Sequence, residues 1–249
     1  MAPRSGGGSG LLRLERGLLG GGMAAVTALC WAYLLKGPVS GAAPPGSAHG
    51  LAVALPLWAV MMTGMMLPST APMLFAYAQV SRRDASGHLA RTLAFILAYL
   101  GLWVLASALG ALAQTGLQAA GVLSHLGAST LPALSGGLLL VAGAYQLSPL
   151  KQACLRGCRT PMGFLLTEWR PGARGALVMG ARHGAECILC CWALMALCFV
   201  LGTMNLLWMG ILTLIMLVEK TFPGGRRVGI VAGWAFLAWG AWVLLESLV

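Results

Sequence analysis

The segment His183-Gly-Ala-Glu186-Cys187-Ile-Leu-Cys190-Cys191 brings nitrogen, oxygen and sulfur donors together over a short stretch of chain. A helix turns about 100° per residue, so these five side chains fall within an arc of about 140° on one face. The spacing Cys187-x-x-Cys190 is typical of a metal or redox pair. One helix cannot surround an ion, so the pattern predicts a soft-metal site that a second helix completes.

Two alternatives stay open for this segment. Cysteine packs well as a small apolar residue, which would account for Cys191 and Cys198 without any ligand role. Packing does not account for His183 and Glu186, because ionisable side chains inside a membrane helix usually face its bundle interior or a pathway. For Glu186 the alternative is an ion pair with Arg182, which would make it structural.

A second group of soft donors is a cluster of methionines in another apolar segment. Its members form two i,i+4 pairs on one helix face: Met61 with Met65, and Met62 with Met66. Neutral thioether sulfur can bind Cu(I) without losing a proton, whereas the alternative is that these side chains only fill gaps between helices. Pro68 removes a backbone hydrogen bond at the carbonyl of Gly64, so the sequence predicts a bend or a break there.

Cys154 and Cys158 form a further thiol pair in a polar stretch with several arginines. On a helical turn residues i and i+4 are neighbours, so these two thiols could share one soft ion. The alternative is a reduced pair without a role. We expect the pair at the cytoplasmic surface, whereas Cys187 begins about 18 Å into its helix at 1.5 Å per residue. That separation disfavours thiol exchange between the two groups.

The amino-acid composition indicates the class of fold that positions these donor side chains. Of the 249 residues, 59% are hydrophobic and only 9% are charged, against about 25% charged residues in soluble domains. A soluble enzyme is therefore excluded, and continuous apolar runs favour an all-α, polytopic transmembrane helix bundle over a barrel. The net charge of +10 indicates basic cytoplasmic loops rather than nucleic-acid binding.

Apolar runs predict about seven transmembrane helices. Their approximate ranges are 18–35, 51–80, 92–113, 131–147, 175–201, 204–218 and 228–245. With the N-terminus inside and the C-terminus outside, all but two of the 16 Lys and Arg residues lie in cytoplasmic segments, as the positive-inside rule requires. We expect a flexible cytoplasmic tail over 1–17, one helical domain over 18–249 with a cytoplasmic loop at 149–174, and a multi-pass location in the cytoplasmic (inner) membrane.

The ordered motifs resemble a known bacterial family. They are Trp58…Met61…Met65-Met66-x-Pro68; Tyr145-Gln-Leu-Ser-Pro-Leu-Lys-x-x-Cys154-Leu-x-x-Cys158-Arg; Arg182-His183-Gly…Cys187-x-x-Cys190-Cys191-Trp-x-Leu-Met195; Met204-Asn205; and Glu219-Lys220. Over about residues 50–249 the chain resembles the predicted metal-binding integral membrane proteins, domain of unknown function 2182. The resemblance implies an integral membrane protein with a metal site.

The donor set favours a soft transition metal, with copper as Cu(I) first and zinc as the second possibility. The function predicted is metal transport or delivery, with the lipid bilayer and a metal chaperone or metalloenzyme as partners and no nucleic acid. A binding role is favoured over an enzymatic one. The alternatives are a membrane thiol–disulfide oxidoreductase and a non-catalytic assembly factor, and the oligomeric state is left open.

Overall fold

The structure is a computed structural model that describes residues 6–36, 47–82, 87–203 and 205–248. Its described residues form an all-α bundle without a named strand, as the composition predicts. The helices are α1 (Gly6–Leu35), α2 (Ala48–Ser81), α3 (His88–Ala119), α4 (Pro132–Leu147), α5 (Pro149–Arg159), α6 (Pro161–Glu168), α7 (Gly172–Ala196), α8 (Cys198–Leu201), α9 (Leu206–Thr221) and α10 (Gly225–Glu246).

Five helices of the described chain are long and apolar enough to cross a membrane. They cover Leu14–Leu35, Ala48–Ser81, His88–Ala119, Gly172–Leu201 and Gly225–Glu246. A sixth span is possible if α4 and α5, which meet at an angle of 64°, count as one broken span. The predicted count of seven is not confirmed, because α9 has only 16 residues and reaches about 24 Å, against about 30 Å of hydrocarbon.

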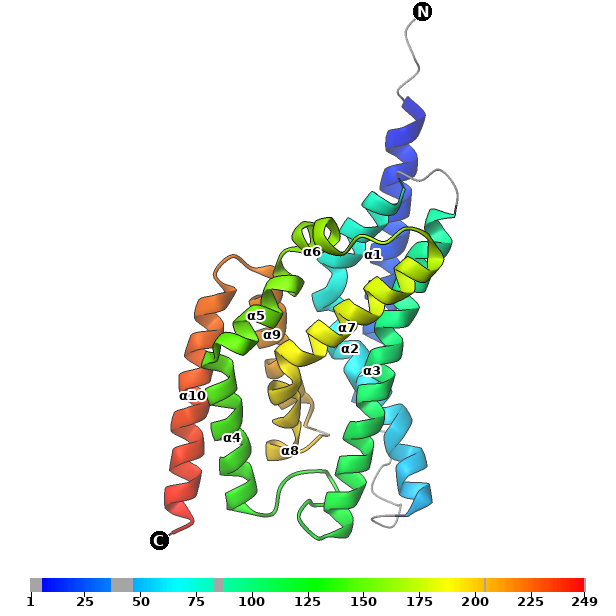
Figure 1. Ribbon diagram of the computed structural model, residues 1–249. Coiled ribbons are helices and arrows are strands. Elements are labelled where there is room, and N and C mark those ends of the chain that lie inside the picture. The colour runs from blue at the N-terminus through cyan, green and yellow to red at the C-terminus, as the bar shows by residue number, and fades with distance from the viewer. Residues whose placement is uncertain (1–5, 37–46, 83–86, 204, 249) are drawn as a thin grey trace, which may run out of the picture.

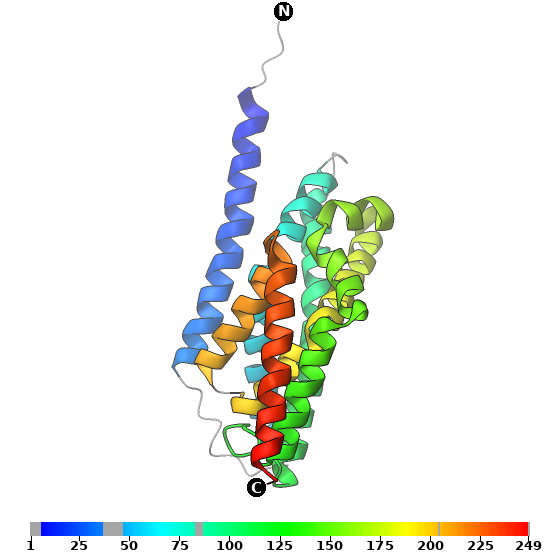
Figure 2. The same ribbon diagram turned by 90° about the vertical axis from the view of Figure 1, so that its left-hand side faces the viewer.

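Helix α1 starts well before the predicted boundary at residue 18. It begins at Gly6 and therefore covers most of the segment predicted as a flexible tail, whereas residues 1–5 lie outside the described residues. Glu15 pairs with Arg82 at 2.8 Å, and Arg16 donates to Gln79 at 2.9 Å. These contacts join α1 to the end of α2, at the edge of the bundle away from α5 and α6 (Figure 2).

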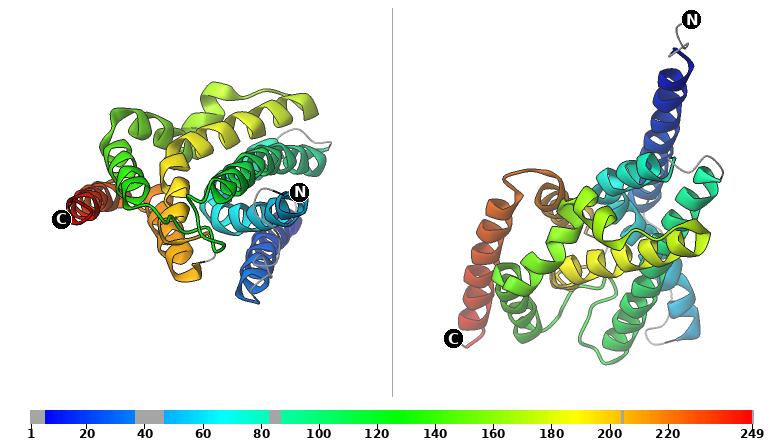
Figure 3. Two further views of the ribbon diagram at one scale, coloured as in Figure 1. Left: turned by 90° about the horizontal axis from the view of Figure 1, so that it is seen from below. Right: turned by 45° about the horizontal axis from the view of Figure 1, so that its top comes forward.

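The second half of α7, together with α8 and α9, lies at the centre of the bundle, between the α2–α3 pair and the α4–α10 pair (Figure 3). Small residues allow this close packing. A Cβ atom on Gly180 of α7 would overlap the carbonyl oxygen of Phe95 on α3, and one on Gly143 of α4 would lie 2.7 Å from the carbonyl oxygen of Gly233 on α10. Gly180 thus allows α7 to lie close against the first half of α3, and Gly143 allows α4 to lie close against α10.

The polar stretch 149–174, predicted to be a cytoplasmic loop, is mostly helical. Ser148 caps α5 by accepting a hydrogen bond from the backbone of Lys151, and Pro149 occupies the first turn. Helix α5 then turns sharply away from α4 and packs against α7 (Figure 1). The stretch therefore contributes to the core of the bundle.

Helix α2 runs without interruption through Pro56, Pro68 and Pro72, so the predicted break near Gly64 is wrong, whereas a bend stays a prediction. The backbone group that Pro68 leaves free is satisfied from outside the helix. The carbonyl oxygen of Gly64 accepts a hydrogen bond from the indole nitrogen of Trp31 at 3.3 Å. This contact removes the cost of a free carbonyl and allows α2 to stay helical across the methionine cluster.

Candidate metal centre

Cys187, near the middle of α7, lies at the centre of a buried group of sulfur and polar atoms. The ammonium nitrogen of Lys220, from the end of α9, lies 3.0 Å from the Cys187 sulfur, and the Tyr99 hydroxyl of α3 lies 3.4 Å from it. All three residues are at most 5% exposed. Side chains from three helices thus converge on one thiol, as a site completed by other helices requires.

Cys158 joins this group, which corrects the expected position of the second thiol pair. It is buried on α5 and packs in the same core as Cys187 and Cys190, close enough for the charge on one thiol to influence the others. Cys154, one turn earlier, is partly exposed and packs against the same core. The predicted separation of about 18 Å assumed that residues 149–174 stay outside the bundle, whereas α5 folds back onto α7.

A buried ion pair holds α5 in this position. The Lys151 ammonium on α5 lies 2.6 Å from the Glu219 carboxylate on α9, and the Gln146 amide bonds to both groups. Lys151 and Glu219 are nearly inaccessible to solvent. Arg159 adds hydrogen bonds of 3.1 Å to the carbonyl oxygens of Phe222 and Pro223. Together these contacts join both ends of α5 to α9 and place Cys158 against α7.

The thiols of Cys190 and Cys191 both donate to the backbone carbonyl of Cys187, at 3.1 and 2.9 Å. In this arrangement both sulfurs carry their protons. The Cys191 sulfur lies 3.9 Å from the Met66 sulfur of α2, and the Lys220 ammonium lies 3.8 Å from the same thioether. The site therefore combines thiols from α5 and α7 with a thioether from α2.

The other three methionines of the predicted cluster are buried without a contact of this kind in the described residues. Met61 and Met65 are at most 1% exposed and belong to the same hydrophobic core. Met62 lines a neighbouring cavity instead. All four methionines are thus buried inside the bundle, and Met66 is the one beside the thiols.

His183 lies one turn before Cys187, at the edge of the thiol group. Its Nε2 atom is 3.1 Å from the Thr70 hydroxyl of α2, and its ring lies among Phe95, Tyr99 and Phe164. Its Nδ1 atom is buried and has no hydrogen-bond partner in the described part of the chain. The histidine is held in place by one nitrogen, which leaves the other available as a donor or acceptor.

Glu186 lies against α5, next to the segment that carries Cys154 and Cys158. Its carboxylate is 3.6 Å from Arg182, which also pairs with Glu168 at 2.7 Å. A Cβ atom added to Gly157 of α5 would overlap the other carboxylate oxygen of Glu186. The ion pair with Arg182, one of the two alternatives from the sequence, is therefore present.

Sequence reasoning assigned no role to Lys220, Tyr99, Ser69 or the Lys151–Glu219 pair. The available signal was Glu219-Lys220, two opposite charges at the end of an apolar run. Neighbouring residues on a helix diverge by about 100°, so the two side chains reach different partners. Glu219 meets Lys151, whereas Lys220 meets Cys187 and lies 3.4 Å from the Ser69 hydroxyl.

The donors suit a soft ion, although their present arrangement is not that of a loaded site. Within the described residues, no group of three or more His, Cys, Asp or Glu side chains is arranged to hold a metal ion. Thiol and thioether sulfur are the ligands that Cu(I) prefers. Cys190 and Cys191 would have to leave the Cys187 carbonyl before they could bind an ion, which a side-chain rotation achieves.

Comparison with known proteins identifies the chain's family. Neither a curated protein nor a solved structure matches it. The profile of the PpoB2 family, described as copper chaperones, matches residues 55–243 and so includes every donor discussed above. This supports the metal-related family that the motifs indicate, whereas its identity with domain of unknown function 2182 stays a prediction. Because the match spans most of its 249 residues, the chain belongs to the PpoB2 family of copper chaperones.

Proposed function

We propose that this chain is a multi-pass membrane protein that binds Cu(I) at the sulfur group between α2, α5, α7 and α9, for transport or delivery. The observation that carries the proposal is the burial of Cys158 from α5 in the same core as Cys187 and Cys190 of α7, with Met66 of α2 lying 3.9 Å from Cys191. Thiols from separate helices, reinforced by a thioether, give a soft ion the ligands that one helix cannot provide. The copper chaperone family supports the same metal.

In this proposal Cys158, Cys187 and Cys190 are the primary ligands, with Cys191 and Met66 beside them. His183, Cys154, Glu186 and Met61 are secondary candidates, whereas Met62 and Met65 are buried neighbours of Met66 on α2. A ligating cysteine must be a thiolate, so binding releases protons. Lys220 lies close enough to offset the negative charge of a dithiolate, which would otherwise be costly in a dry interior.

Copper is favoured over zinc by the thioether. Zinc in proteins takes thiolate, imidazole and carboxylate ligands in a closed tetrahedral site, whereas methionine sulfur is typical of Cu(I). The test is metal analysis of protein purified in detergent without oxygen, followed by competition with a Cu(I) chelator. We expect one tightly held copper per chain, and its absence when Cys158, Cys187 and Cys190 are all serine. Equal copper in this triple variant would contradict the proposal.

The location proposed is the cytoplasmic membrane of a bacterium, with the N-terminus inside. The ends of α2 and α9, the helices α5 and α6, and the start of α10 gather at one end of the bundle (Figure 1), and these segments carry many of the basic residues. A reporter that is active only in the cytoplasm should give a signal when fused at Gly224 and none at the C-terminus. The opposite result would reverse the orientation. The partner proposed is a metal chaperone or metalloenzyme.

A thiol–disulfide oxidoreductase is the second candidate, because Cys158 is buried in the same core as Cys187 and Cys190. Two of these thiols would form a disulfide, passing two electrons and two protons to the disulfide of a partner protein, which becomes two thiols. Counting free thiols after treatment with an oxidised dithiol protein distinguishes the two functions. The loss of two thiols per chain, reversed by reduction, would favour this candidate, whereas an unchanged count with retained copper would favour the chaperone.

A further inference from the structure

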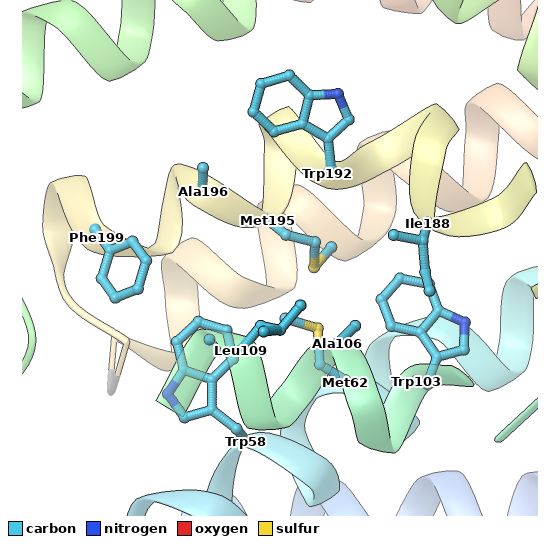
Figure 4. A pocket seen from close by; sticks show the side chains of 11 residues that line it. Trp58, Met62, Trp103, Ala106, Leu109, Ile188, Trp192, Met195, Ala196 and Phe199 are labelled. Atoms are coloured by element: carbon cyan, nitrogen blue, oxygen red, sulfur yellow. The ribbon is translucent and has the colours of Figure 1, made fainter. Parts of the chain in front are cut away.

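An apolar cavity of about 270 Å³ lies beside the sulfur group, between α2, α3, α7 and α8. Met62 of α2 and Met195 of α7 line it, and Figure 4 shows their sulfur atoms pointing toward one another. The rings of Trp58 and Trp103 form walls on either side of the two thioethers (Figure 4). The cavity thus holds two soft donors from different helices in one space.

The cavity continues the contacts of the sulfur group along the same two helices. On α7 the residues at four-residue spacing are His183, Cys187, Cys191 and Met195, and on α2 they are Trp58, Met62, Met66 and Thr70. Such residues share one helix face. The two faces meet at Thr70 with His183 at 3.1 Å and at Met66 with Cys191 at 3.9 Å. Beyond the end of α7, Trp58 meets Phe199 of α8 at 5.5 Å between ring centroids.

Met62 and Met195 lie between the Met66–Cys191 contact and the Trp58–Phe199 contact. On each chain segment they are four residues from both. Each lies one turn from the corresponding sulfur of the thiol group, about 6 Å along the helix axis at 1.5 Å per residue. An ion that leaves Met66 and Cys191 along this interface therefore reaches two thioethers next. No further backbone rearrangement is needed to place them, because both are already buried and face the cavity.

The walls suit a cation that carries a single charge and binds weakly. No charged residue lines the cavity, so no side chain there would neutralise the charge of a bound ion. The face of a tryptophan ring attracts such a cation. Trp58 is fixed as a wall because its indole nitrogen donates to Gln114 at 2.7 Å. Two neutral thioethers and aromatic faces should hold the ion less tightly than thiolates do.

We propose that Met62 and Met195 form a second binding site for a soft monovalent cation, weaker than the cysteine site and one helical turn beyond it. The inference rests on the proposed copper function. It adds a second site that the ion occupies on its way to or from the cysteine site. A weaker site next to a tight one is suited to transfer, because passage requires binding that is favourable yet reversible.

The test is a titration of the full-length protein in detergent with Ag(I), a soft monovalent ion that does not change oxidation state under these conditions. The parent should bind one ion tightly and a second more weakly. Met62→Leu with Met195→Leu should lose the weaker ion and keep the tight one, since leucine preserves volume but not the sulfur. The control is Met73→Leu with Met209→Leu, which removes two buried thioethers outside the cavity and should keep both ions.

The outcomes separate this inference from the proposed function. A parent that binds only the tight ion, or a Met62–Met195 variant that keeps both, overturns the second site and leaves the cysteine site intact. The proposed function is overturned if the parent binds no ion tightly, or if its tight binding does not depend on Cys158 and Cys187. Retention of the tight ion by the Met62–Met195 variant also shows that the variant is folded, so the loss of the weaker ion then supports the inference.

Discussion

Glu219 and Lys220 are neighbours on α9, yet they enter two buried clusters of opposite character. Glu219 belongs to a closed network in which Lys151 and Gln146 satisfy both carboxylate oxygens. Lys220 enters the sulfur group, and among the ion pairs of the described residues none joins it to a carboxylate. A fully paired network fixes helices, whereas a buried cation beside thiols is what an ion-binding site would use.

The largest effect should come from breaking the closed network on one side only. Lys151→Met leaves the Glu219 carboxylate buried without its cation, which should lower the free energy of unfolding by about 3–5 kcal/mol. Thermal unfolding in detergent measures this loss. The double variant Lys151→Met with Glu219→Leu should recover much of it, because no charge is then left unpaired. Equal losses in the single and double variants would contradict the structural role of the pair.

Removing a thiol should affect copper more than the fold. Cys187→Ser and Cys158→Ser should each weaken Cu(I) retention by at least about tenfold, since even residues outside the ligand shell change metal affinity by that much. Chelator competition measures the retention. Cys198→Ala is the matched control, because Cys198 is equally buried and, within the described residues, its side chain makes no hydrogen bond to the thiol group. If the control loses as much copper, the thiols act through packing.

Lys220→Met tests the other side of the comparison. The ammonium lies 3.0 Å from Cys187 and would offset the charge of a Cu(I) dithiolate, so its loss should weaken Cu(I) binding by roughly tenfold, which is about 1.4 kcal/mol. The melting temperature should change less than in Lys151→Met. Tighter binding in Lys220→Met would mean that the ammonium competes with the ion for the sulfur atoms.

A smaller effect is expected at the thioether. Met66→Leu keeps the volume but removes the sulfur beside Cys191, and should weaken Cu(I) binding a few-fold at most. Met65→Leu, at a buried neighbouring position without that contact, should leave the affinity unchanged. Chelator competition distinguishes the two variants, and an equal loss in both would assign the effect to packing of α2.

The smallest effect is expected at Glu186. Its carboxylate pairs with Arg182, so Glu186→Gln should change copper retention by less than about twofold, within the range of a surface ion pair. The same chelator competition measures it. A loss comparable to that of Cys187→Ser would instead make Glu186 a ligand.

The sequence by itself determined the class of fold and most of the donors. Low charge content and continuous apolar runs require helices in a bundle, because backbone groups must be satisfied inside a membrane. The i,i+4 spacing of Cys187 with Cys191, and of Met62 with Met66, places donors on common faces whatever the tertiary arrangement. Apolar runs also predicted the approximate bounds of α2, α4 and α10.

Only the tertiary structure decided which donors meet. The arginine-rich composition of 149–174 predicted a loop, yet α5 returns to the bundle because Lys151 finds a buried carboxylate far along the chain at Glu219. Composition and local spacing carry no information about such a pairing. The same long-range contact brings Cys158 to Cys187, while Lys220 approaches from α9. Periodicity assigns a residue to a face, but only helix packing determines which face lies opposite it.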